Sequence, residues 1–158
     1  MDNFNKDLEF GNVGEDIVLK RIQDKHPRAY KITGKHKEYD IVIPKLFSKT
    51  TIEVKTDRTQ HSNFFIETHH NNNLSGINAT TADWWCYIIQ DNFYLIETKQ
   101  IKKCIKENNP VHMENLPKST GTVNAYIIPK DTFIKYCFKK VRLSEYEKCL
   151  LNLKKVKR

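Results

Sequence analysis

The segment from residue 38 to residue 58, EYDIVIPKLFSKTTIEVKTDR, constrains the fold more than any other part of the chain. It holds two short apolar runs separated by a polar loop, a pattern that predicts two neighbouring antiparallel strands. Side chains alternate between the two faces of a strand, so Glu53 and Lys55 would share one face with Thr51 while the apolar residues between them point into a core. The short loop would also bring Asp40 opposite this strand.

Helical patterns flank the strands and predict a mixed α/β fold with a central sheet. Apolar residues at helical spacing predict a first helix over residues 7–25. A second helix is expected over residues 99–107. The last helix is expected to start at Ser144, where Ser144 and Glu147 match the pattern of a capping box.

The strand predictions alternate with turn signals along the rest of the chain. Strands are expected at residues 29–33, 39–44, 50–56, 63–68, 84–90, 93–98 and 123–128. Asp91 and Asn92 are expected to form a hairpin turn, and residues 69–83 a surface loop that leads into a short helix over 77–82. A proline-containing loop is expected over residues 109–122.

The length of 158 residues suits a single domain, which would end in a basic helix and tail over about residues 143–158. Hydrophobic residues make up 39% and charged residues 29% of the chain, as in ordinary soluble proteins. No apolar run approaches the roughly 20 residues needed to cross a bilayer, and the N-terminus lacks a signal sequence, so a cytoplasmic protein is expected. The four cysteines lack paired spacing and are expected to be free thiols.

The formal net charge of +8 is concentrated near the C-terminus. Nine lysines and arginines lie between Lys135 and Arg158, against Glu145 and Glu147. Such a segment fits a polyanionic partner such as nucleic acid, and it equally fits a solvated tail that keeps the protein soluble. It lacks the large apolar face of a membrane-binding helix, so no membrane partner is expected.

Asp40, Glu53 and Lys55 form a set that phosphoryl chemistry requires and folding does not. Two carboxylates that converge on one point repel each other unless a cation lies between them, and hard oxygen ligands favour Mg²⁺, with Mn²⁺ as a substitute. Such an ion activates water for attack on a phosphodiester, while a lysine orients that water or offsets developing charge. The alternative is a set of surface charges held in salt bridges.

The order of these residues resembles the PD-(D/E)XK nuclease superfamily, which includes Holliday-junction resolvases and many phage nucleases. The resemblance rests on Glu15 in the first helix, Asp40 on one strand and the Glu-Val-Lys triplet at residues 53–55 on the next. It covers about residues 7–90 and implies a restriction-endonuclease-like core, with a central mixed sheet flanked by helices. Tyr39 stands where the name of the family has proline, a position that varies widely in the superfamily.

The resemblance also implies a role for each residue of the set. Asp40 and Glu53 would be metal ligands, together with the main-chain carbonyl of Val54, and Lys55 would be the catalytic lysine. Glu15 would match the acid of the first helix that assists metal binding in several branches. A glutamate on an amphipathic helix is also often solvent-facing, and both interpretations of Glu15 stay open.

A second Glu-x-Lys triplet, Glu97 to Lys99, tests how specific this pattern is. Asp83 lies upstream of it, and a hairpin would bring the two ends together. Lys99, however, lies past the end of its expected strand, where Thr98 looks like a helix N-cap, while Lys55 stands inside an apolar strand. The first triplet is therefore the favoured site.

Polar and basic residues on either side of the first triplet are candidates for contact with nucleic acid. Arg58, Gln60 and His61 directly follow the expected catalytic strand, and Lys35 and Lys37 precede Asp40. They are expected to contact phosphates, on the basis of position alone.

Three further features each allow a functional and a purely structural interpretation. Glu67 ends a strand and is either another acid of the site or a surface charge. His69 and His70 are adjacent, so their side chains point apart, and they are expected in a mobile loop. Trp84 and Trp85 either stack on bases or, for at least one of them, belong to the core.

The sequence therefore predicts a metal-dependent nuclease that hydrolyses DNA phosphodiesters, as an endonuclease rather than an exonuclease. A small chain without a recognition domain fits structure-specific or weakly sequence-specific cutting. Small enzymes of this fold are commonly dimers, and RNA stays open as a substrate. The alternative is a catalytically inactive nuclease-like module that only binds nucleic acid.

Overall fold

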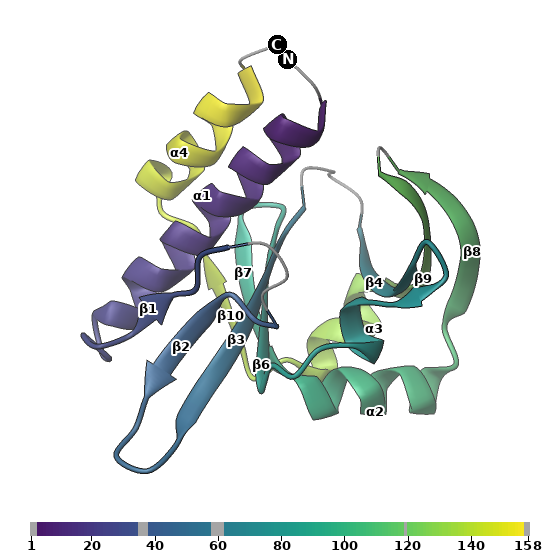
Figure 1. Ribbon diagram of the computed structural model, residues 1–158, viewed down its shortest axis with the longest axis horizontal. Helices are drawn as coiled ribbons and strands as arrows, with labels where there is room; N and C mark the ends of the chain where they lie inside the picture. Colours follow the sequence, from purple (N-terminus) through teal and green to yellow (C-terminus); the bar gives the residue numbers. More distant parts are fainter. Residues whose placement is uncertain (1–2, 35–37, 58–61, 119, 157–158) are drawn as a thin grey trace.

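The computed structural model describes residues 3–34, 38–57, 62–118 and 120–156. A six-stranded mixed sheet lies at its centre, with α1 and α4 on one face and a second, four-stranded sheet with α2 and α3 on the other (Figure 1). The helices are α1 (Asn3–Gln23), α2 (Thr98–Asn108), α3 (Lys130–Phe133) and α4 (Glu145–Val156), with 3₁₀ turns η1 (Gly76–Asn78) and η2 (Ile134–Tyr136). The expected mixed α/β architecture with a central sheet is confirmed.

Each sheet is built mainly from strands that are close in sequence. The central sheet has the order β1 (Tyr30–Lys31), β2 (Ile41–Pro44), β3 (Lys49–Thr56), β6 (Trp84–Ile89), β7 (Asn92–Glu97) and β10 (Lys139–Arg142). The second sheet has the order β5 (Asn73–Leu74), β4 (Asn63–His70), β9 (Gly121–Pro129) and β8 (Val111–Lys118).

The segment 38–58 forms the expected pair of strands. β2 and β3 are antiparallel, with Ile41 opposite Ile52. β3 and β6 run parallel, with Lys55 opposite Tyr87, and the remaining neighbours in both sheets are antiparallel. The central sheet is therefore mixed, and its one parallel pair lies beside the charged triplet.

One core fills the space between the central sheet and the helices α1 and α4. It includes Phe10, Ile17, Val18, Ile41, Ile52, Val54, Cys86, Ile88, Phe93 and Leu151. Gly14 lets α1 approach β3 closely, since a Cβ there would lie 1.8 Å from Thr56 Oγ1. The even-numbered residues of β3 thus face α1, as alternation predicts, and Glu53 and Lys55 face the other way.

A second core joins the opposite face of the central sheet to the second sheet and α2. Its centre is aromatic: the rings of Phe64 and Phe133 stack with centroids 4.1 Å apart, and Phe64 meets Tyr87 and Tyr94 edge to face at 5.3 and 5.2 Å. Such geometries suit the quadrupoles of the rings. β6 contributes Trp85 and Tyr87 here and Cys86 and Ile88 to the first core, so this strand is buried on both faces.

The β6–β7 turn lies one residue before the expected position. Its central residues are Gln90 and Asp91, with φ of 48° and 60°, rather than Asp91 and Asn92. Positive φ at both central residues is typical of a type I′ turn, whose twist matches that of the two strands that it joins. Asn92 instead starts β7.

The prediction of a loop over residues 69–83 is wrong for residues 69–74. β4 continues through His69 and His70, turns at Asn71 and Asn72 with φ of 47° and 65°, and returns as β5. Asparagine tolerates the left-handed conformation better than most residues, so the asparagine run provides a tight turn. The short helix expected over 77–82 is η1 and ends earlier.

Besides β5, two further strands were not predicted, β8 and β10. β8 covers most of the expected loop over residues 109–122, and nearly all its residues are exposed. β10 is a basic edge strand at the margin of the central sheet. Neither shows apolar alternation, because neither buries one face of its side chains in a core.

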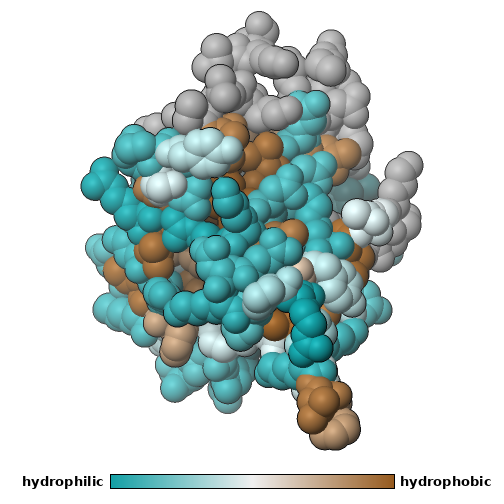
Figure 2. Space-filling view, turned by 90° about the vertical axis from the view of Figure 1, so that its left-hand side faces the viewer, coloured by the Kyte–Doolittle hydropathy of each residue, from teal (hydrophilic) through white to brown (hydrophobic). Residues whose placement is uncertain are grey.

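The hairpin between β2 and β3 projects from the body of the molecule. Leu46 and Phe47 at its tip are 83% and 95% exposed. Figure 2, which views the molecule from the left-hand side of Figure 1, shows a hydrophobic projection at the lower edge of a largely hydrophilic face. Among the described residues, no helix is both long and apolar enough to span a membrane.

Candidate active site

Asp40 lies directly before β2 and is only 4% exposed. Its N–H donates to Ile52 O at 2.9 Å, and its Oδ2 accepts a hydrogen bond from Val54 N–H at 2.6 Å. The register of β2 and β3, with Ile41 opposite Ile52, brings Asp40 opposite Glu53. The main chain of the triplet therefore fixes the Asp40 carboxylate, and two acids occupy neighbouring positions on adjacent strands.

Glu53 and Lys55 lie on the same face of β3, as predicted. Lys55 Nζ is 2.6 Å from Glu53 Oε1, and the two side chains are 45% and 16% exposed. Burial lowers the pKa of Lys55, but the charge and hydrogen bond of Glu53, with the charges of Asp40 and Glu67, raise it by more. The net pKa is raised, so Lys55 carries its proton at neutral pH.

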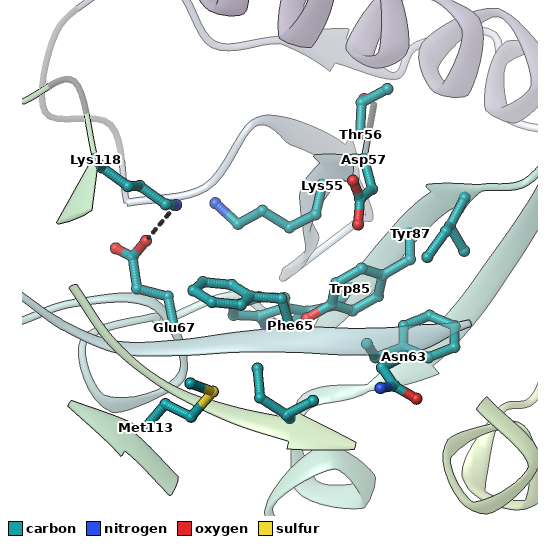
Figure 3. Close-up of a pocket in the computed structure, with 13 residues that line it drawn as sticks. Lys55, Thr56, Asp57, Asn63, Phe65, Glu67, Trp85, Tyr87, Met113 and Lys118 are labelled. Carbon is teal, nitrogen blue, oxygen red and sulfur yellow. Dashed lines mark hydrogen bonds and ion pairs between the residues drawn. The ribbon is translucent and has the colours of Figure 1, made fainter. Parts of the chain in front are cut away.

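A cavity of about 590 Å³ opens beside Lys55, between the central sheet and the second sheet (Figure 3). Lys55 lines it together with Glu67, Trp85, Tyr87 and Lys118. Lys55 Nζ lies 5.7 Å from the centroid of the Trp85 ring. The candidate lysine thus faces a space that admits a ligand, and the second sheet forms the opposite wall.

Glu67 belongs to this wall and is not merely a surface charge at a strand end. It forms an ion pair with Lys118 Nζ at 3.4 Å and accepts a hydrogen bond from the Ser75 hydroxyl. A β-bulge follows Glu67 in the pairing of β4 with β9, and bulges commonly re-aim side chains. Gly76 packs against it so closely that a Cβ would lie 2.2 Å from Glu67 O.

Glu15 lies on the other face of the central sheet. It is 8% exposed, and its Oε2 lies 3.3 Å from Lys31 Nζ, which also pairs with Asp16 at 2.7 Å. Lys31 is opposite Ile41 in the β1–β2 pair, on the side that faces α1. The solvent-facing interpretation of Glu15 is wrong, and the structure holds this acid in an ion pair with β1.

The donors near Asp40 fit a hard divalent cation held by few protein ligands. In the part of the chain that the structure describes, no group of three or more His, Cys, Asp or Glu gathers as a metal site. Asp40, Glu53 and the Val54 carbonyl offer oxygen donors, and Mg²⁺ commonly uses one or two carboxylates while it keeps several waters. This donor set fits Mg²⁺ or Mn²⁺ and does not fit a metal that needs a complete protein cage.

The second triplet has the same ion pair in a different setting. Lys99 Nζ lies 2.5 Å from Glu97 Oε2, but Lys99 is in α2 and 75% exposed. Asp83 instead binds to strand β3: its Oδ2 accepts hydrogen bonds from Thr51 N–H at 2.8 Å and from the Thr51 hydroxyl at 3.1 Å. Asp83 is therefore a structural residue of this region, which supports the choice of the first triplet.

Thr98 is not the N-cap of α2. It is the first residue of that helix, Glu97 occupies the N-cap position, and the Thr98 hydroxyl donates to the Ala82 carbonyl. The threonine therefore ties α2 to the segment before β6 rather than capping its own helix.

The predicted nucleic-acid contacts Arg58, Gln60, His61, Lys35 and Lys37 all lie outside the described residues. Their roles stay predictions.

The remaining candidates have clear positions. Trp85 is 1% exposed and belongs to the core, which confirms that at least one tryptophan is structural. His69 and His70 lie in β4 rather than in a mobile loop, with His70 Nε2 3.0 Å from Thr120 Oγ1. Lys118 and Met113 also line the cavity and were not predicted, because both lie on the unpredicted strand β8. The only signal for them was their basic or apolar character.

Comparison with known proteins leaves the family open. No protein-family model matches the sequence, and no curated protein matches it. Among solved structures, the bacterial homing endonuclease I-Ssp6803I matches with a TM-score of 0.40 and 16% identity, over 85% of this chain and 76% of that chain. At a TM-score this low, the similarity identifies neither a family nor a function.

Proposed function

We propose that the protein is a metal-dependent nuclease of the PD-(D/E)XK type that hydrolyses DNA phosphodiester bonds. The observation that carries the proposal is the convergence of Asp40, Glu53 and Lys55 at the β2–β3 pair, beside an open cavity. The carboxylate of Asp40, only 4% exposed and next to a second acid, is costly for folding. Such a cost is typical of a site that serves a function rather than stability.

Each residue has a distinct part in the proposed reaction. Asp40 and Glu53, with the Val54 carbonyl, would hold Mg²⁺, which when bound supplies a Lewis acid toward the phosphodiester and activates water. The hydrogen bond from Val54 N–H keeps Asp40 oriented toward the triplet. Lys55, which carries its proton at neutral pH, would donate to a phosphate oxygen and offset the charge that develops in the transition state.

Two substitutions test this assignment. Lys55→Ala and Asp40→Asn are each expected to lower Mg²⁺-dependent cleavage on the order of 100-fold or more, because each removes charge stabilisation or metal binding. Cleavage would be followed on linear, nicked, flapped, single-stranded and four-way-junction DNA, with Mg²⁺ and with chelator. DNA binding in chelator should be largely retained.

Lys99→Ala is the matched control, because Lys99 forms the same pair with a glutamate two residues before it. It should cut as fast as the parent protein. If Lys55→Ala and Asp40→Asn also cut at the parent rate, the site assignment is wrong.

The second candidate function is a nuclease-like module that binds nucleic acid without cutting it. It is favoured by the fact that, within the described segments, no three metal-binding side chains gather at one point. Binding of several substrates with no product, in either Mg²⁺ or Mn²⁺, would support this module over the nuclease.

A further inference from the structure

The cavity beside Lys55 is larger and less polar than binding a phosphate requires. Its volume of about 590 Å³ falls within the range of small-molecule sites, roughly 300–1,000 Å³. It extends from Lys55 along the face of β6 toward β4 and β8. What fills this space is a question separate from the metal chemistry at Asp40.

The walls of the cavity are aromatic and apolar. Trp85 and Tyr87 stack with centroids 5.8 Å apart and planes inclined by 26°, and they form the wall on β6. Phe65, half-buried on β4, and Met113, 41% exposed on β8, form the opposite side. Figure 3 shows Phe65 in the middle of these side chains. Such walls suit a flat ring, which stacks on aromatic faces.

Two buried donors on residues that line the cavity, the indole N–H of Trp85 and the hydroxyl of Tyr87, have no acceptor among the described residues. Tyr87 is 4% exposed, and none of the described residues accepts a hydrogen bond from its hydroxyl. In Figure 3 the Tyr87 ring points into the group formed by Phe65 and Trp85. Burial and the charges of Glu53 and Glu67 raise its pKa well above the usual value, so the hydroxyl keeps its proton as a donor. An unmade hydrogen bond of this kind is costly, and a ligand acceptor would satisfy it.

Both lysines that line the cavity are paired with glutamates, and Asp57 lines it as well. Lys55 is paired with Glu53, and Lys118 is paired with Glu67. Lys118 also lies over the Phe65 ring, 4.9 Å from its centroid. A site whose lysines are already paired with carboxylates, whose walls are aromatic and whose buried donors lack acceptors fits a neutral planar ring with a carbonyl group better than it fits a phosphate.

We propose that this cavity binds an unpaired nucleobase, which stacks against Phe65 and accepts a hydrogen bond from Tyr87. The inference rests on the proposed nuclease function, since the base would belong to the strand whose phosphate lies at Lys55. The substrate would then be a single strand, a flap or another structure with an unpaired base. Thymine, cytosine and guanine carry an exocyclic carbonyl and should be preferred to adenine.

Binding in chelator tests the site without any need for cleavage. The affinity of a short thymidine oligonucleotide and of the matching adenosine oligonucleotide would be measured by fluorescence anisotropy. Phe65→Ala is expected to weaken binding of the thymidine strand roughly 5- to 100-fold, the range for loss of one stacked base. Tyr87→Phe is expected to weaken it several-fold and to reduce the preference for thymidine over adenosine, with little effect on the adenosine strand.

Phe47→Ala is the matched control, since Phe47 is an aromatic residue 95% exposed at the tip of the β2–β3 hairpin and does not line the cavity. It should bind both strands as the parent does. Tyr87→Phe removes one oxygen and keeps the ring, so it stays informative if Phe65→Ala fails to fold. Parent-like binding and base preference in Tyr87→Phe would overturn the proposal.

The two proposals fail in different ways. A protein that cuts DNA but binds thymidine strands independently of Phe65 and Tyr87 is a nuclease without this base site. A protein that binds them through Phe65 and Tyr87 but cuts nothing retains the base site and loses the proposed catalysis.

Discussion

At the scale of single residues, Gly14 sets the distance between α1 and the strand that carries Lys55. A Cβ at this position would lie 1.8 Å from Thr56 Oγ1 and 3.0 Å from Thr56 Cβ. Gly14→Ala is therefore expected to destabilise the protein by about 1–3 kcal/mol, the range for overpacking. The free energy of unfolding from urea denaturation would measure the loss.

Gly11 gives the matched control on the same helix, because no atom lies within 4 Å of a Cβ placed there. Gly11→Ala is expected to stabilise by about 0.5–1 kcal/mol, since alanine loses less backbone entropy than glycine in a helix. In the Gly14→Ala background, Thr56→Ala should recover part of the stability. Equal effects of the two glycine substitutions would contradict this account of the α1–β3 contact.

The residues of the candidate site differ in how far sequence could place them. Alternation alone put Glu53 and Lys55 on one face of β3, and a short loop put Asp40 beside them. The position of Lys118 depends on how β8 packs beside the cavity, and the local sequence around Lys118 does not predict that packing. Glu67 was visible as an acid at a strand end, but the bulge and the closely packed Gly76 that fix it are tertiary features.

At the scale of elements, an ion pair between Arg21 and Glu147 joins α1 to α4. Arg21 Nη2 donates to Glu147 Oε2 at 2.6 Å, and Glu147 also accepts from Ser144 N–H and the Ser144 hydroxyl at 2.7 and 2.8 Å. Ser144 Oγ accepts from Glu147 N–H at 3.3 Å, so the predicted capping box is confirmed. The same glutamate therefore starts α4 and attaches it to α1.

This arrangement predicts how stability depends on pH. The hydrogen bond from Arg21, with those from Ser144, lowers the pKa of Glu147 to about 2 against the opposing effect of burial. The stabilisation, on the order of 2–3 kcal/mol, is fully present above the unfolded pKa near 4.5 and is lost as pH falls toward 2. Denaturant unfolding at a series of pH values would show a shallower decline in Glu147→Gln, which should also be less stable at neutral pH.

Glu145→Gln is the control, because Glu145 lies on the same turn of α4 and is 89% exposed. Its pair with Lys148 is a surface ion pair, which contributes little. Its pH profile should run nearly parallel to that of the parent. A parent-like slope in Glu147→Gln would show that the Arg21 pair does not control acid stability.

The elements that sequence failed to predict share a physical cause. β8 and β10 bury no regular face, so periodicity is absent, and their hydrogen bonds to β9 and β7 decide their conformation. The asparagine turn after His70 was mistaken for a loop because propensity alone does not show that the flanking residues find a partner strand. The long buried strands and amphipathic helices, in contrast, carry their pattern in local sequence.

At the scale of the whole molecule, the central sheet separates two apolar cores, and its edge strand β10 is exposed and basic. Lys139 and Lys140 lie exposed on the edge strand β10, within the basic segment that starts at Lys135. If this segment contacts nucleic acid, each lysine that neutralises a phosphate adds about 0.9 to the slope of log affinity against log salt. Lys139→Gln/Lys140→Gln is therefore expected to lower the slope by about 1–2.

The control must remove the same charge elsewhere, because net charge alone steers a polyanion toward the protein. Lys103→Gln/Lys106→Gln does so on α2, where both side chains are exposed. Duplex DNA affinity in chelator, measured between about 50 and 200 mM salt, should show a reduced slope for the β10 variant alone. Equal slopes in the two variants would mean that the basic segment acts only through net charge, as a solvated tail. A reduced slope for the β10 pair would instead extend the DNA-binding surface to the edge of the central sheet opposite β1.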